Sequence, residues 1–149
     1  MSEIAYLQTT ERLKIRTTGP GLTEVTAELR VFIPAGSSWI LTLFVRHTSC
    51  SLLIQENADP DVQTDLLEYL DRLVPPSSHP SMSYLVHTYE GPDDMPAHIK
   101  AALLPTCLTI PVSAGQMLLG TWQGVYLVEH RTHPHTREVI AQFSGEGPA

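Results

Sequence analysis

Three histidines occupy positions where they could take part in chemistry. His47 follows directly after an apolar segment, and His87 and His98 flank a loop that contains Asp93 and Asp94. A histidine at the end of a strand can titrate near neutral pH and serve as a base, an acid or a metal ligand. Imidazole and carboxylate groups together suit a divalent metal ion. We therefore predict a polar pocket in which His47, His87 and His98 bind a metal. In the alternative, His47, His98 and Asp94 are the catalytic groups.

The same residues also have structural interpretations. A histidine that ends a strand, as His47 does, can simply be hydrogen-bonded there. Asp93 and Asp94 precede a predicted helix, so either one could cap it. The free N–H groups of that helix terminus could instead bind a phosphate. The two aspartates oppose phosphate binding unless a cation bridges them to it.

A second polar group comprises Asn57, Asp59 and Gln123. The first two precede a proline, which is the usual chemistry of a turn and a helix cap. Gly120 and Gly124 flank a strand segment, where glycine indicates a bulge or the close approach of a ligand or another backbone. Trp122 and its neighbour Gln123 have opposite parity, so if one of them is buried we expect the other to face a polar site.

The remaining histidines and the cysteines have simpler interpretations. His130, His133 and His135 lie around a proline, and we expect an exposed turn rather than a metal site. Cys50 points away from His47 in strand geometry and is expected to be a small buried side chain. With Cys107 it makes no disulfide framework, so both are expected to be free thiols.

The elements that must position these residues follow from hydrophobic periodicity and turn signals. Strands are predicted at 4–17, 39–46, 82–89, 106–112, 116–129 and 137–144. Helices are predicted at 22–32, 60–73 and 96–104, the second with a buried apolar stripe. Strand 39–46 is apolar enough to be buried on both faces. With no helix between the last strands, the pattern favours an α+β fold, a sandwich-like mixed or antiparallel sheet with about three helices.

Composition narrows the class of protein. A chain of 149 residues has the size of one domain, 1–149. The formal net charge of −7 argues against a nucleic-acid binder, which would carry a basic stripe, and against docking to anionic membranes. No apolar run approaches the roughly 18 residues of a membrane span, and the first ten residues lack the features of a signal peptide. We therefore expect a cytoplasmic protein with no nucleic-acid or membrane partner.

Four strings, in this order and spacing, resemble the YjbQ family, also called the secondary thiamine-phosphate synthase family. They are 47–49 with 56–60, 89–100, 120–124 and 145–146. The resemblance implies an α+β homotrimer with pockets near subunit interfaces. It also implies a small phosphorylated metabolite as the substrate, and the joining of a pyrimidine pyrophosphate to a thiazole phosphate with help from a divalent cation, usually Mg²⁺. By matching position, the site would be lined by His47, Asn57, Asp59, His87, Asp94, His98 and Gln123.

Three functions therefore stand as hypotheses. The first is this transferase, with Asn57, Asp59 and Gln123 contacting the substrate. The second is a metal-dependent hydrolase with Zn²⁺ on the three histidines, in which Glu56, Asp94 or Glu129 would be the base. The third is a metabolite-binding trimer without catalysis.

Overall fold

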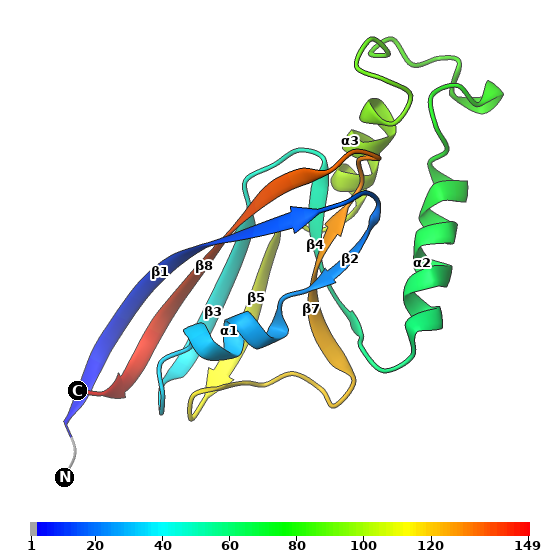
Figure 1. Ribbon diagram of the computed structural model, residues 1–149. Coiled ribbons are helices and arrows are strands. Elements are labelled where there is room, and N and C mark those ends of the chain that lie inside the picture. The colour runs from blue at the N-terminus through cyan, green and yellow to red at the C-terminus, as the bar shows by residue number, and fades with distance from the viewer. Residues whose placement is uncertain (1–2) are drawn as a thin grey trace.

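A computed structural model describes residues 3–149, which form two antiparallel sheets accompanied by three α-helices (Figure 1). The larger sheet has the order β1 (Ile4–Thr17), β8 (His135–Pro148), β3 (Ser38–Val45), β5 (Cys107–Ser113) and β6 (Gln116–Met117). The smaller sheet has the order β2 (Gly21–Glu24), β7 (Gln123–Glu129) and β4 (Cys50–Glu56). The predicted α+β fold with an antiparallel sheet is confirmed.

The first and last strands of the chain lie side by side along their full length. β1 pairs with β8 from Ile4 opposite Pro148 to Thr17 opposite His135. β8 in turn pairs with β3 on its other side, so it lies inside the sheet. The last strand is therefore longer than the predicted 137–144, because β1 pairs with it from His135 to Pro148, while β3 pairs with its other side from Val139 to Glu146.

The core lies where apolar side chains of both sheets meet α1 (Thr26–Phe32). Leu41, Leu52, Leu127 and Phe143 are fully buried there, as is Leu29 of the helix. Each such side chain contributes roughly 1.5–3 kcal/mol by leaving water. This core holds the two sheets and α1 together.

The outer face of β3 is left partly exposed by residues 3–149. Trp39, Ile40 and Phe44 are 52%, 42% and 47% exposed. The prediction that strand 39–46 is buried on both faces is wrong for the single chain, because no helix of residues 3–149 packs on that side. An apolar band thus remains on the surface of the larger sheet.

The helices differ from prediction in their starts and in their burial. The segment predicted as helix 22–32 begins with strand β2, and α1 starts only at Thr26. α2 (Pro60–Leu73) has the predicted cap, with the Asp59 side chain accepting from the Asp61 N–H at 2.9 Å. Its predicted buried stripe is wrong: no residue of α2 is buried, since the helix stands beside the sheets (Figure 1). A groove of about 750 Å³ lies along it.

Four further segments depart from prediction. The strand predicted at 82–89 is absent, and a 3-10 turn at Pro80–Met82 leads into an irregular segment in which Val86 is 93% exposed. The strand predicted at 116–129 is interrupted, giving β6 and β7. β4 was not predicted, because its polar ends resemble a loop. α3 (Asp94–Leu103) starts two residues before the predicted position.

The helices of residues 3–149 are all too short or too polar to cross a membrane.

Candidate metal centre

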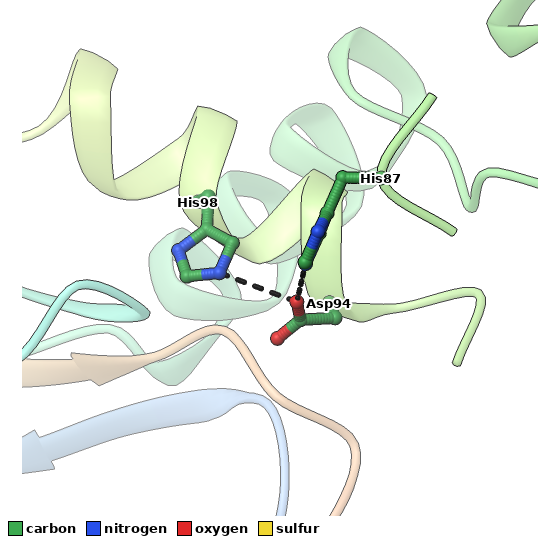
Figure 2. A group of neighbouring side chains, drawn as sticks. All are labelled: His87, Asp94 and His98. Carbon is green, nitrogen blue, oxygen red and sulfur yellow. Dashed lines mark hydrogen bonds and ion pairs between the residues drawn. The ribbon is translucent and has the colours of Figure 1, made fainter. Parts of the chain in front are cut away.

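His87, Asp94 and His98 come together at the start of α3. Asp94 is the first residue of the helix and His98 lies one turn later, so both side chains occupy the same face. His87 reaches them from the irregular segment before the helix. The three ligand atoms all lie within 4.8 Å of one another. Figure 2 shows both imidazoles directed toward the Asp94 carboxylate.

Both ring nitrogens converge on one carboxylate oxygen. Oδ2 of Asp94 lies 2.8 Å from His87 Nε2 and 3.2 Å from His98 Nε2. Burial alone would raise the pKa of Asp94, but the hydrogen bond from His87 and the charges of His98 and Arg131 hold the pKa below its usual value. The carboxylate is therefore ionised at neutral pH.

Arg131 fixes the other oxygen of this carboxylate. Its Nη1 donates to Asp94 Oδ1 at 2.7 Å, and its Nε donates to Asp93 Oδ2 at 2.8 Å. The Thr132 N–H also donates to Asp93 Oδ2, at 3.0 Å. Burial opposes ionisation of Asp93, but these hydrogen bonds lower its pKa to about 2. Asp93 therefore anchors Arg131 and makes no side-chain cap for the helix.

The ring of His98 is oriented by a backbone carbonyl. Its Nδ1 donates to the Thr48 carbonyl oxygen at 2.9 Å. A carbonyl only accepts, so Nδ1 carries a proton, and Nε2 is the ring atom directed toward Asp94. Metal-binding histidines in proteins usually show this arrangement, in which an outer acceptor fixes the tautomer.

His87 lies between two carboxylates. Besides Asp94, its Nε2 lies 2.9 Å from Glu90 Oε2. The hydrogen bond to Asp94 raises the pKa of His87 against a smaller effect of burial, and Glu90 raises it further. Glu90 is 55% exposed in its side chain, so this side of the centre is open to solvent.

The predicted role of His47 as a metal ligand is not reflected in this cluster. His47 is not among the three residues whose ligand atoms lie within 4.8 Å of one another. Its Nε2 accepts from the Glu138 backbone N–H at 2.8 Å. Burial, and then the charge of Arg137, lowers the pKa of His47. Of the three predicted histidines, the structure thus brings His87 and His98 together, with Asp94 as the third member of the cluster.

The predicted substrate-binding residues Asn57 and Gln123 lie elsewhere. Together with Arg30 and Thr121 they line a pocket of about 520 Å³ that shares no residue with the cluster of His87, Asp94 and His98. Asp59, the third of these residues, caps α2.

The glycine-bounded segment of this pocket lies close to neighbouring side chains. A Cβ at Gly124 would come within 2.6 Å of Glu24 Oε2, so the close approach is that of a side chain and not of the expected ligand or backbone. Trp122 and Gln123 are both exposed, so the condition of that prediction, the burial of one of them, is not met. The reason is that Trp122 lies in the loop before β7, where strand parity does not apply.

Sequence reasoning missed Arg131, Thr48 and Glu90. No local pattern links Arg131 to Asp93 and Asp94, which are 38 and 37 positions away. The prediction that His130 lies in an exposed turn is also wrong. His130 is 4% exposed, and its Nε2 pairs with Ser51 Oγ at 2.9 Å. Every residue from 124 to 129 of β7 is buried, and this continuous buried run extends into His130.

Comparison with known proteins identifies the family. The sequence profile described as "UPF0047 protein YjbQ-like" matches residues 11–146. The chain belongs to the YjbQ (UPF0047) family. It is 46% identical over 147 residues to the UPF0047 protein sll1880 of Synechocystis, covering 97% of each chain. It is 43% identical over 114 residues to the UPF0047 protein YjbQ of Escherichia coli, covering 76% of this chain and 79% of that protein.

Solved structures of the YjbQ family share the fold. The conserved hypothetical protein TT1486 of Thermus thermophilus has a TM-score of 0.75 at 34% identity, covering 87% of this chain and 97% of that one. A YjbQ/UPF0047 protein of Clostridium acetobutylicum has a TM-score of 0.77 at 28% identity, covering 89% and 99%. These relatives establish family and fold, and the reaction must be inferred from the chemistry of the site.

Proposed function

We propose that the chain is a divalent-metal-dependent hydrolase acting on a small phosphorylated molecule, with the metal held by His87, Asp94 and His98. The observation that carries the proposal is the convergence of two imidazole nitrogens on one ionised carboxylate, with all three ligand atoms within 4.8 Å. Two histidines and a carboxylate are a ligand set of catalytic zinc sites. The orientation of His98 by the Thr48 carbonyl adds support.

The donor atoms favour Zn²⁺ over Mg²⁺. Imidazole suits zinc and other transition metals, whereas Mg²⁺ prefers carboxylate, carbonyl and water oxygens. An ion bound here would supply Lewis acidity toward a phosphoryl or carbonyl oxygen of the substrate. This preference is our reason for placing the hydrolase ahead of the Mg²⁺-assisted transferase.

Glu90 is the best-placed base. Its exposed carboxylate lies 2.9 Å from His87 Nε2, at the open side of the centre, where it can take a proton from an attacking water. Asp94 is held by Arg131 and suits a ligand role. Glu129 is 2% exposed and paired with Arg137, which suits a structural role better than that of a base. Glu56 accepts from the Asp59 N–H, in the segment that leads into α2.

A transferase resembling secondary thiamine-phosphate synthase is the second candidate. Family membership favours it, and so does the separate pocket of about 520 Å³, where Arg30 and the amides of Asn57 and Gln123 could hold a phosphate. Turnover of the pyrimidine pyrophosphate and thiazole phosphate precursors, lost in Gln123→Ala, would support this candidate over hydrolysis.

A homotrimer remains part of the proposal. The apolar band of Trp39, Ile40 and Phe44 offers a surface that a second copy could cover. Light scattering on purified protein measures the mass of the assembly and so tests the homotrimer. The variant Phe44→Lys is expected to dissociate it. Thermal stabilisation by a phosphorylated metabolite without any turnover would instead favour the binding trimer without catalysis.

The decisive test of the metal is its content per chain. Protein purified without chelator or histidine tag is expected to retain one Zn²⁺ per chain. His98→Ala and His87→Ala should each lose it, because each removes one of three ligands. The matched control is His133→Ala, an exposed histidine outside the cluster. Equal zinc in wild type, His98→Ala and His87→Ala would refute the site.

A further inference from the structure

A buried ion pair lies behind the candidate centre. Glu129 is 2% exposed and Arg137 is 4% exposed. Nε of Arg137 donates to Glu129 Oε1 at 2.8 Å and its Nη2 donates to Oε2 at 2.5 Å, while Thr17 Oγ1 donates to Oε1 at 2.6 Å. Desolvation makes a buried pair weak evidence for stability, since apolar residues of similar volume often serve as well. The other hydrogen bonds of Glu129 and Arg137 therefore indicate what the pair does besides stabilising the fold.

The arginine holds the residue next to the carbonyl that orients His98. Nη2 of Arg137 donates to the Ser49 carbonyl oxygen at 3.3 Å and to Ser49 Oγ at 2.9 Å. The residue just before Ser49 is Thr48, whose carbonyl accepts from His98 Nδ1 at 2.9 Å. Arg137 thus holds in place the backbone that sets the tautomer of His98.

The glutamate fixes the backbone from which Arg131 extends. Oε2 of Glu129 accepts from the backbone N–H of His130 at 3.0 Å and of Arg131 at 3.2 Å. The Arg131 side chain then donates to Asp94 Oδ1 at 2.7 Å. Glu129 is thus linked to Asp94 through Arg131, and Arg137 is linked to His98 through Ser49 and Thr48. Each of these two chains of contacts is called a route below.

We propose that the Glu129–Arg137 pair is the positioning element of the cluster formed by His87, Asp94 and His98. It aligns two of the three ligands through two separate hydrogen-bonded routes from one buried pair. The expected effect on metal affinity rests on the proposed metal function. The expected effect on the His98 tautomer rests on the hydrogen-bond geometry alone. Outer-shell residues of this kind typically change metal affinity by about 10–100-fold when replaced.

The test compares Arg137→Lys with Leu41→Ala. Lysine keeps the positive charge, but its single ammonium cannot reproduce the fork that reaches both Glu129 and Ser49. Leu41 is fully buried in the larger sheet and outside the centre, so Leu41→Ala destabilises the fold without touching these routes. Two quantities are measured: the dissociation constant for Zn²⁺, and the tautomer of His98 in metal-free protein from its ¹⁵N resonances.

The expected result is at least a tenfold loss of Zn²⁺ affinity in Arg137→Lys, with His98 becoming a mixture of tautomers. Neither change is expected in Leu41→Ala. Unchanged affinity and tautomer in Arg137→Lys would overturn the proposal, as would equal losses in both variants. If Arg137→Lys does not fold, Ser49→Ala removes a single contact of Arg137, and a smaller shift in the same direction is expected.

The two proposals fail separately. Wild-type protein that binds no Zn²⁺ refutes the metal function, and the His98 tautomer then decides the positioning role alone. Retention of the pure Nδ1–H tautomer in Arg137→Lys would refute that role.

Discussion

Stability should fall on mild acidification because His130 is buried in its neutral form. The ring is 4% exposed, and its Nε2 pairs with Ser51 Oγ at 2.9 Å. Burial, followed by the charge of Lys100, lowers the pKa of His130 to about 4. An unfolded chain has a histidine pKa of about 6.5. Between these values the unfolded state binds a proton that the folded state does not.

The size of the effect follows from this difference in pKa. The contribution is fully present above about pH 6.5 and is lost as the pH falls toward about 4. Between about pH 7 and pH 5, the unfolding free energy should fall by about 2 kcal/mol from this residue alone. The loss over the full window is about 3 kcal/mol.

Urea unfolding at several pH values, on wild type and His130→Gln, measures this loss. Glutamine can keep a hydrogen bond to Ser51 but does not titrate, so the difference between the two proteins isolates His130. Contributions from other groups, such as the lowered pKa of His47, cancel in that difference. Parallel stability curves for the two proteins from pH 7 to pH 5 would refute the reasoning.

Three further predictions concern thiols, the buried ion pair and the arginine at the centre. Burial raises the pKa of the Cys50 thiol to about 12, whereas Cys107 is exposed. A thiol reagent at about pH 8 should therefore modify one cysteine of the native chain and both cysteines in denaturant. Two fast-reacting thiols in native protein would contradict this prediction. Glu129→Ala leaves the Arg137 charge buried and unpaired, so the unfolding free energy measured by urea titration should fall by about 3–5 kcal/mol. A fall below about 1 kcal/mol would show that the two residues do not form a buried ion pair. Arg131→Gln should weaken Zn²⁺ binding by about 10-fold or more, because the Asp94 carboxylate loses its anchor, with the exposed Arg16→Gln as the matched control. Equal affinity in the two arginine variants would argue against that anchor.

Local signals in the sequence predicted much of the helical part of the site. The cap at Asp59 and the proline after it fixed the start of α2, because capping depends on neighbouring residues only. The four-residue spacing of Asp94 and His98 places both on one face of α3. His87 was also predicted, since a loop between two histidines can bring them together.

Long-range pairing could not be predicted in this way. Arg131 contacts the start of α3 only because β7 ends there, and that placement depends on the sheet order. The stripe of α2 has helical periodicity, yet periodicity does not say whether another element lies against it. The apolar outer side of β3 likewise matches a buried strand in sequence, although residues 3–149 leave it about half exposed.

An anomalous difference map at the zinc absorption edge, from crystals of protein purified without chelator, tests the central claim most directly. The account predicts one peak per chain, about 2.0–2.2 Å from His87 Nε2, an Asp94 carboxylate oxygen and His98 Nε2. A map with no peak at these residues, or with its peak at the exposed His133 instead, would contradict it.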